Sequence, residues 1–387
     1  MIAIAIAAFA ITMLFSIFEG IKVDVRHNAW NYETGEIRIR NADFDRYEHL
    51  NPVHYVVPDY ERLVDRLSER SAVSAVSPRI KIAGAAFRGE QHIAANGIGL
   101  DLQLEQRYQE LDTIVAEGRL PQPGTREAIL GTGLAEELDV GIGDMATFLT
   151  RTRNRRSNGF SVDVVGLAVF PMAGLNDNTF ILPIDTASRY ARMGDAATEV
   201  LVKSDTGELS AVEAAVRSAL SESGIKGMSV TPWTEVSGGY AYLQMADAVY
   251  NIIALIFFLL GSTVVINTTM MTIHERTREI GTLTAMGMHD RELVRLFFIE
   301  AAYLGLAGSL LGVVLGIGAT LPLQHLGIDF GQAMEQANME MSTVLYPVLN
   351  LRSTVVVFVY SSAIAMFASF FPARRAAKLK PVEALRD

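Results

Sequence analysis

The chain has 387 residues, of which half are apolar and 20% are charged, and it contains no cysteine. This length allows two or three domains, and the composition lies between that of a soluble protein and that of one buried entirely in lipid. Residues 19–247 hold 23 Lys and Arg against 33 Asp and Glu, so this polar block carries the whole net charge of −10. Such acidity argues against nucleic-acid binding, and the absence of cysteine excludes disulfides and thiolate metal sites.

Four windows contain no Asp, Glu, Lys or Arg: Met1–Phe18, Ala248–Ile273, Ala301–Ile328 and Ser353–Ala373. About 20 apolar residues cross a bilayer as a helix, so the sequence predicts four membrane helices. The first window lacks the basic start and the cleavage site of a secretory signal, and we expect it to be a retained anchor.

Basic residues predict the orientation of these helices, because short cytoplasmic loops are rich in Lys and Arg. Residues 274–300 contain four Arg, and residues 374–387 contain five Lys and Arg, whereas residues 329–352 contain only Arg352. We therefore expect both termini in the cytoplasm and the acidic block outside, which in a bacterium means an inner-membrane protein with a periplasmic domain.

The acidic block shows a mixed α and β pattern. Alternation at Glu36–Arg40, Phe160–Val169 and Glu199–Lys203 predicts half-buried strands. Helical spacing of apolar residues predicts helices at Pro58–Ser71 and Ser210–Ser221. The predicted fold is thus an α-helical membrane protein with four transmembrane helices and a large α+β extracytoplasmic domain between helices 1 and 2.

Residue patterns typical of catalysis are absent from the sequence. It has no GxSxG motif, and its seven histidines show no metal-ligand spacing. Asp43 and Asp45 are followed by no calcium-loop pattern, so a solvated turn is expected there. The Arg151–Arg156 cluster is interpreted as an exposed hairpin tip, with a contact surface for an acidic partner as the alternative. We predict no catalytic residue, no metal and no cofactor in this chain, and since it lacks a Walker loop, ATP and Mg would be bound by another chain.

Small residues recur at four-residue spacing in the third apolar segment. Gly308, Gly312 and Gly316 share one helix face, which allows another helix to approach closely in lipid. Glu300 stands at the start of this segment, where an ionisable group must lie at the interface or pair with a neighbouring helix. Of these roles, structural pairing is favoured over a proton relay.

The loop between the second and third apolar segments predicts a short amphipathic helix along the membrane surface, or one that inserts into a groove of a cytosolic partner. Ile280, Leu283 and Gly287 share a side. A small-residue face is expected from Gly281, Ala285 and Gly287, and the charged residues at the leading end are Glu275, Arg276, Arg278 and Glu279.

These residues resemble a known family. Glu275, Arg276, Arg278, Glu279, Ile280, Gly281, Ala285 and Gly287 are similar to the coupling segment of the permease superfamily that includes the lipoprotein-releasing LolC and LolE, the efflux pump MacB and the cell-division protein FtsX. The similarity continues through Glu300, Gly308 and Gly312 into the tail. Matching tail residues are Pro372, Arg374, Arg375, Lys378, Pro381 and Arg386. In the outer block, Pro78–Ile80, Ile129–Ala135, Gly143–Asp144 and Trp233–Glu235 look most like LolC/LolE and MacB.

The resemblance implies an ABC transporter permease that works by mechanotransmission. Two permease chains, identical or homologous, would pair with two copies of a cytosolic ATPase, whose closure is felt by residues 274–292 and passed to the outer domain. The expected parts in chain order are helix 1 at 1–20, a periplasmic domain at 21–240, helix 2 at 241–273, the coupling helix at 274–292, helix 3 at 293–327, a periplasmic loop at 328–351, helix 4 at 352–372 and a basic cytoplasmic tail at 373–387.

Lipoprotein release from the inner membrane is the expected function, with a periplasmic lipoprotein carrier as a further partner. The alternatives are an FtsX-like regulator of a periplasmic cell-wall hydrolase and a MacB-like efflux permease. One departure from the family is expected to concern helix 1, because the family has a basic segment before it and this chain begins at Met1 inside the apolar run.

Overall fold

The computed structural model describes residues 1–47, 52–89, 91–204, 208–330 and 344–376. The chain forms two compact units, a helix-bundle unit of residues 1–23, 243–330 and 344 onward, and an α+β unit of residues 24–242. Two helices, α1 (Ile2–Asn28) and α10 (Gly238–Glu275), contribute residues to both units. Each unit is described on its own below.

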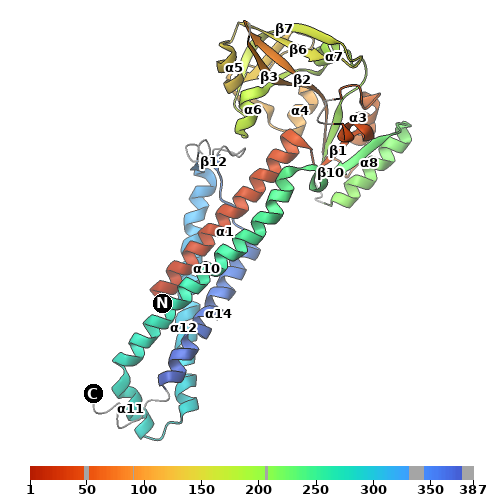
Figure 1. The fold of residues 1–387 in the computed structure, drawn as a ribbon. Coiled ribbons are helices and arrows are strands. Elements are labelled where there is room, and N and C mark those ends of the chain that lie inside the picture. Colours follow the sequence, from red (N-terminus) through yellow and green to blue (C-terminus); the bar gives the residue numbers. More distant parts are fainter. Residues whose placement is uncertain (48–51, 90, 205–207, 331–343, 377–387) are drawn as a thin grey trace. The chain divides into compact units, whose positions relative to one another are not determined.

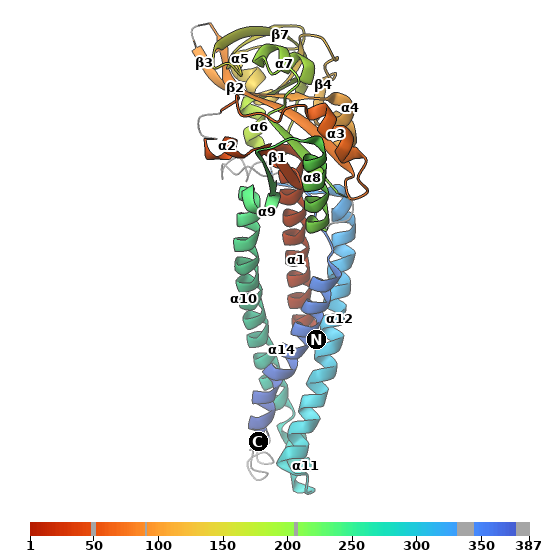
Figure 2. The same cartoon turned by 90° about the vertical axis from the view of Figure 1, so that its right-hand side faces the viewer.

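Four helices of the described chain are long and apolar enough to cross a membrane. They are α1, α10, α12 (Asp290–Leu326) and α14 (Leu351–Ala376), which run alongside one another in the bundle (Figures 1 and 2). A short helix, α11 (Thr277–Ala285), follows α10, and the two-residue strands β11 (Ile328–Asp329) and β12 (Val344–Leu345) pair with each other.

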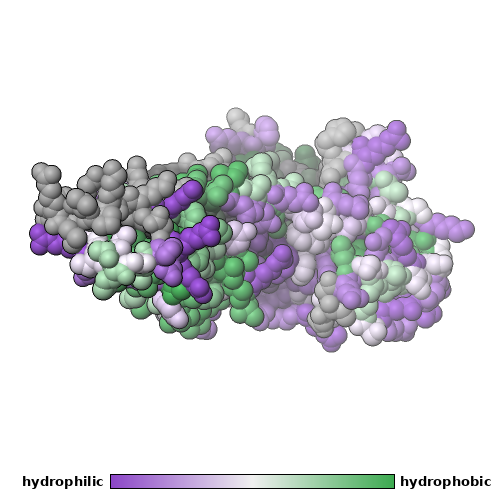
Figure 3. All heavy atoms as spheres, turned by 90° about the horizontal axis from the view of Figure 1, so that it is seen from below, coloured by the Kyte–Doolittle hydropathy of each residue, from purple (hydrophilic) through white to green (hydrophobic). Residues whose placement is uncertain are grey.

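Apolar side chains cover the outside of the bundle. Leu255, Leu260, Leu310 and Val314 are each more than half exposed, and Figure 3 shows hydrophobic residues gathered on the bundle, with hydrophilic residues prevailing on the α+β unit. Contact of this surface with water would be unfavourable, because transfer of each such side chain out of water contributes about 1.5–3 kcal/mol of free energy. This apolar exterior is what a lipid-facing bundle requires.

The α+β unit is built on a ten-stranded mixed sheet of order β10-β1-β9-β2-β3-β8-β5-β7-β4, with β6 pairing β2 and β7. Its strands are β1 (Ile37–Asn41), β2 (Ala75–Arg88), β3 (Gln91–Leu100), β4 (Val115–Gly118), β5 (Glu127–Gly131), β6 (Met145–Arg151), β7 (Ser157–Ala168), β8 (Thr179–Pro183), β9 (Glu199–Lys203) and β10 (Met228–Pro232).

Short helices cover this sheet. They are the π-helical segment η1 (Ala29–Glu33), α2 (Ala42–Arg46), α3 (Tyr60–Ser68), α4 (Leu102–Tyr108), the 3-10 turn η3 (Leu111–Ile114), α5 (Thr132–Leu138), α6 (Ala173–Asn178), α7 (Ile184–Ala191), α8 (Leu209–Ser223) and α9 (Trp233–Val236). One core packs α3 and α8 on β1, β9 and β10, and a second packs α5 and α7 on the longer strands. The helices predicted from periodicity at Pro58–Ser71 and Ser210–Ser221 are confirmed as α3 and α8.

The predicted half-buried strands are only partly correct. Strand β7 alternates as expected, with Val162 and Val164 buried and their neighbours partly exposed. In β1, however, Arg38 and Arg40 are buried as well as Ile37 and Ile39. The alternation does reflect two faces, but the arginine face is covered by other elements and its charges are paired internally, so it does not face water.

Two turn predictions have different outcomes. The Arg151–Arg156 segment does connect two strands, β6 and β7, as expected of a hairpin. Asp45 does not lie in a solvated turn: it belongs to α2, which Asn41 caps by accepting a hydrogen bond from the Asp43 amide, and it pairs with Arg38 and Arg40. Spacing along the chain could not reveal these arginines as its partners.

Candidate functional site

The segment between α10 and α12 forms a compact corner of the helix bundle. Ile280 of α11 is 2% exposed and packs with Ile273 of α10 and with Leu293 and Phe297 of α12. The corner closes at Gly287, whose φ of +98° is a backbone conformation that side-chain-bearing residues rarely adopt. Helix α12 then starts with a capping box in which His289 and Glu292 exchange hydrogen bonds.

The charged residues predicted for this segment lie on its surface. Glu275, Arg276, Arg278 and Glu279 are all exposed. Met286, between α11 and α12, is 77% exposed. Such exposure is unusual for a large apolar side chain outside the membrane-spanning helices. Sequence reasoning did not single out Met286, although an apolar residue at the tip of a charged helix was a usable signal.

The predicted small-residue face does not form. Gly281 is buried, whereas Ala285 and Gly287 are exposed. The helix ends at Ala285, so Gly287 lies beyond it and does not share a helix side with Ile280 and Leu283. Helical periodicity does not predict the position of Gly287, because the chain leaves the helix after Ala285 and turns at this glycine, whose φ is positive.

An ion pair joins the two ends of the corner. Arg276, between α10 and α11, donates to the Glu300 carboxylate of α12 across 3.0 Å, and both side chains are partly exposed, at 45% and 38%. Of the two roles considered for Glu300, pairing with a neighbouring helix is the one that the structure shows. A cavity of about 660 Å³ lies beside this pair, lined by α1, α10 and α12 residues that include Thr268, Thr272 and Phe297.

The glycine stripe of α12 lies directly against α1. A methyl group added at Gly308 would come within 2.9 Å of the Met1 carbonyl oxygen, and one at Gly316 within 2.7 Å of Thr12 Cβ. At Gly312 it would meet the Ala5 carbonyl oxygen. Only glycine permits this backbone approach, which supplies packing and dispersion between helices in lipid.

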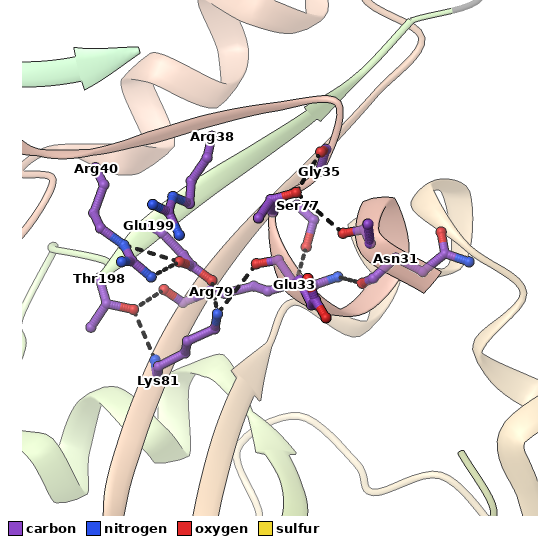
Figure 4. A network of polar contacts seen from close by, with 12 residues as sticks. Asn31, Glu33, Gly35, Arg38, Arg40, Ser77, Arg79, Lys81, Thr198 and Glu199 are labelled. Atoms are coloured by element: carbon purple, nitrogen blue, oxygen red, sulfur yellow. Dashed lines mark hydrogen bonds and ion pairs between the residues drawn. The ribbon is translucent and has the colours of Figure 1, made fainter. Parts of the chain in front are cut away.

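A network of buried polar groups in the α+β unit was missed by the sequence analysis (Figure 4). Arg79 of β2 is 1% exposed and pairs with Glu105 of α4 at 2.8 Å, and it also donates to the carbonyl of Asn31 in η1 at 2.5 Å. Lys203 donates to the Asn31 side chain and, at 2.7 Å, to the Tyr108 carbonyl. Burial together with the nearby Arg79 charge lowers the pKa of Lys203 to about 8, although Glu105 and Glu36 oppose the shift.

This network ties the segment after α1 to the sheet and to the segment before α10. The Tyr108 hydroxyl donates to the Trp30 carbonyl at 2.8 Å, and the Trp30 and Trp233 rings meet edge to face with centroids 5.9 Å apart. Ser237 donates to Glu33 at 3.3 Å. The signal available in the sequence was the run of alternating basic residues in β1 and β2, which places their charges on one sheet face.

Within the described residues, no group of three or more His, Asp or Glu side chains could hold a metal ion. Of the predicted tail residues, Arg374 is exposed near the end of α14, and Pro372 and Arg375 belong to the same helix. Lys378, Pro381 and Arg386 lie outside the described residues.

Comparison with known proteins gives two family matches. Residues 1–219 match the MacB-like periplasmic core domain, and residues 251–381 match the FtsX-like permease C-terminal family. The first covers more than half of the chain and includes α1 and most of the α+β unit. The second includes α11, the Arg276–Glu300 pair and the glycine stripe.

Three relatives show how far the similarity extends. An uncharacterized ABC transporter permease of Methanocaldococcus jannaschii is 25% identical over 78% of this chain and 72% of its own length. The lipoprotein-releasing system transmembrane protein LolC of Xylella fastidiosa is 24% identical over 91% of this chain and 87% of its own length. The macrolide export ATP-binding/permease protein MacB of Pasteurella multocida is 36% identical, but over 37% of this chain and 20% of its own length. With both halves matched, the chain belongs to the MacB/FtsX-like superfamily of ABC transporter permeases.

Proposed function

We propose that this permease is the membrane subunit of an ATP-driven transporter that releases lipoproteins from the bacterial inner membrane. The observation that carries this proposal is the extent of the similarity to LolC, which spans 91% of this chain and 87% of the relative, whereas the similarity to MacB spans one fifth of that protein. Most of the relative's length is therefore matched by this chain. MacB-type export is the second candidate, favoured by higher identity over the shared third of the chain.

The exposed charged and apolar surface of the α10–α12 corner is proposed to bind a cytosolic ATPase, with one ATPase per permease in a complex of two permeases. Glu275, Arg278, Glu279 and Met286 would contact the ATPase, and the packed corner beneath them would carry its movement into α10 and α12. Arg276 and Glu300 would hold these helices together during that movement. The ATPase chain would bind ATP and Mg, and this permease would be non-catalytic.

The orientation proposed follows the basic residues. The α10–α12 corner and both termini would lie in the cytoplasm and the α+β unit in the periplasm, where it would meet lipoprotein and its carrier. Two features support transfer of movement between the compartments: α1 and α10 are continuous helices with residues in both units, and the buried network joins η1 and α9 to one sheet. Continuous helices of this kind could carry a displacement along the chain without a pore.

Reconstitution tests this function. The chain would be copurified with its ATPase, placed in liposomes loaded with a fluorescent triacylated lipoprotein, and given ATP and a soluble acceptor. ATP-dependent appearance of lipoprotein in the soluble fraction supports the proposal. ATP-dependent loss of a macrolide without lipoprotein release would favour the MacB-type candidate and contradict lipoprotein release.

Met286→Asp is the variant that links release to ATPase docking. Its charge would oppose an apolar contact at an exposed position, so release and stimulated ATP hydrolysis should fall at least tenfold while the bundle still folds. Ile142→Asp is the matched control, since Ile142 is an exposed apolar residue of the α+β unit at 48%. Normal coupling in Met286→Asp would remove the proposed docking site.

A further inference from the structure

A cleft of about 620 Å³ opens inside the α+β unit, and none of the family matches assigns it a ligand. Its walls come from η1, β1, α2, β2, β3, α6, β8 and α9. A cavity of this size is typical of small-molecule sites, which range over about 300–1,000 Å³. The inference below concerns this cleft alone and does not depend on the proposed transport function.

Cations form one wall of the cleft. Arg38 and Arg40 stand two residues apart on β1 and therefore share a sheet face, and Lys81 of β2 joins them. Figure 4 shows their side chains converging on Glu199. Arg40 is bound on both sides, to Glu199 at 2.6 Å and to Asp45 at 3.1 Å, and Lys81 contacts Glu199 at 2.8 Å.

Arg38 differs from Arg40 and Lys81 because one of its buried donors has no acceptor among the described residues. Its side chain is 7% exposed, and one terminal nitrogen donates to Asp45 at 3.1 Å. Its Nε is buried and has no hydrogen-bond partner among the described residues. A guanidinium carries five N–H donors in a planar fork, and a buried donor without an acceptor costs about 1–3 kcal/mol. An oxyanion in the cleft would supply the missing acceptors.

The carboxylates of the cleft do not compete for a ligand cation. Asp45 already accepts from Arg38 and Arg40, and Glu33 accepts from Ser237. Burial also lowers the pKa of Lys81, although Glu199 opposes the shift, so an added anion would stabilise the charged ammonium. Asp45 and Glu33 are thus engaged, whereas Arg38 Nε still lacks an acceptor in the described chain, so the group that this site can still bind is an anion and not a cation.

Apolar side chains also line the cleft. Ile98 of β3, Leu175 of α6 and Val236 of α9 line it and are each partly exposed. We propose that the cleft binds an amphipathic oxyanion, a small molecule whose phosphate or carboxylate head is held by Arg38 beside Lys81 and whose apolar part lies against Ile98, Leu175 and Val236. Arg38 is the specificity-determining residue of this site because its planar fork matches an oxyanion.

The chain carries its own reporters for this test. Its two tryptophans, Trp30 and Trp233, belong to η1 and α9, which both line the cleft. The full chain in nanodiscs of zwitterionic lipid would be titrated with hexyl phosphate, inorganic phosphate and 1-hexanol while tryptophan fluorescence is recorded. We expect a saturable change with hexyl phosphate, and weaker binding of both other probes because each offers only one half of the interaction.

Three variants assign the binding to the cleft. Arg38→Met should weaken hexyl phosphate binding about tenfold or more, the usual range for a lost charged hydrogen bond. Asn96→Asp, at an exposed lining position of β3, should weaken it several-fold by repulsion without disturbing packing, and it keeps the test decisive if Arg38→Met fails to fold. Arg88→Met, which removes an exposed arginine of β2 outside the cleft, should bind as the wild type does.

Specific results would overturn the proposal. If Arg38→Met folds and both it and Asn96→Asp bind hexyl phosphate with the affinity of the wild type, the anion binds elsewhere. Equal binding of 1-hexanol and hexyl phosphate would show a purely apolar site, and equal binding of inorganic phosphate would remove the amphipathic ligand. If tryptophan fluorescence shows no saturable change below about 10 mM hexyl phosphate, the cleft does not bind this class of ligand.

Discussion

Single glycines in α12 determine how closely α1 can approach, and two of them make a matched pair for experiment. Gly312→Ala places a methyl group against the Ala5 carbonyl oxygen and within 2.7 Å of Ala8 Cβ. Overpacking of this kind costs about 1–3 kcal/mol, so the variant should unfold in detergent at a temperature several degrees lower.

Gly318→Ala is the control for that prediction. It lies two residues beyond Gly316 in the same helix, and apart from the adjoining helix backbone no described atom would lie within 4 Å of its added methyl group. Its unfolding temperature should equal or exceed that of the wild type, since alanine favours helix. Equal destabilisation of both variants would contradict the assigned helix contact.

The Arg79–Glu105 pair is buried at 1–2% exposure, so its loss should be costly. Glu105→Gln leaves the Arg79 charge without its carboxylate inside the α+β unit. Breaking such a pair costs about 3–5 kcal/mol, which a denaturation midpoint would show. Glu213→Gln is the matched control, because Glu213 forms an exposed i,i+4 pair with Arg217 that contributes about 0.5 kcal/mol or less. A similar small effect in both variants would disprove the structural weight given to the network.

Glu199 makes the stability of the α+β unit depend on acid pH. Burial alone would raise its pKa, but the charges of Lys81, Arg40 and Arg38 outweigh burial and hold the pKa at about 2. A folded-state pKa below the ordinary value of 4.5 adds stability above pH 4.5, and this contribution is lost as the pH falls toward 2. Glu199→Gln should therefore be less stable to unfolding than the wild type at neutral pH, and this difference in stability should narrow between pH 4.5 and 2. A difference independent of pH would exclude the ionised carboxylate as its cause.

At the scale of elements, the α10–α12 corner depends on the Arg276–Glu300 pair. Arg276→Glu sets two carboxylates against each other and should reduce ATPase coupling while membrane insertion persists. The double variant Arg276→Glu with Glu300→Arg restores opposite charges and should recover most of the coupling. No recovery in the double variant would show that Arg276 acts by a contact other than this ion pair.

Elements differed in how well the sequence predicted them. The apolar windows are long and uniform, and α1, α10, α12 and α14 contain nearly all of their residues. Strand β1 was harder, because an alternating Ile-Arg pattern describes two different faces without saying what covers the second. Helix α2 follows β1 directly, and its Asp45 pairs with Arg38 and Arg40. Another partner of Arg40 is Glu199, which tertiary folding brings from 159 residues further along the chain.

At the scale of the whole molecule, charge segregation carried most of the sequence prediction. The acidic block of residues 19–247 largely coincides with the α+β unit, and the neutral remainder with the helix bundle. The local motif predicted where the corner between α10 and α12 lies in the sequence. It did not predict which of its residues are exposed, because burial of Gly281 and exposure of Met286 depend on how α11 packs on Ile273 and Phe297. The cleft beside Arg38 could not be predicted at all, because eight separate elements form it.

The central claim is that the α10–α12 corner binds a separate ATPase. The chain has no cysteine, so Met286→Cys and the control Ile142→Cys each provide a single attachment point for a photo-crosslinker in native membranes, with the adducts identified by mass spectrometry. The account predicts that position 286 captures a protein with a Walker phosphate loop and that position 142 does not. Capture of no ATPase at position 286, while the permease remains folded in the membrane, would contradict it.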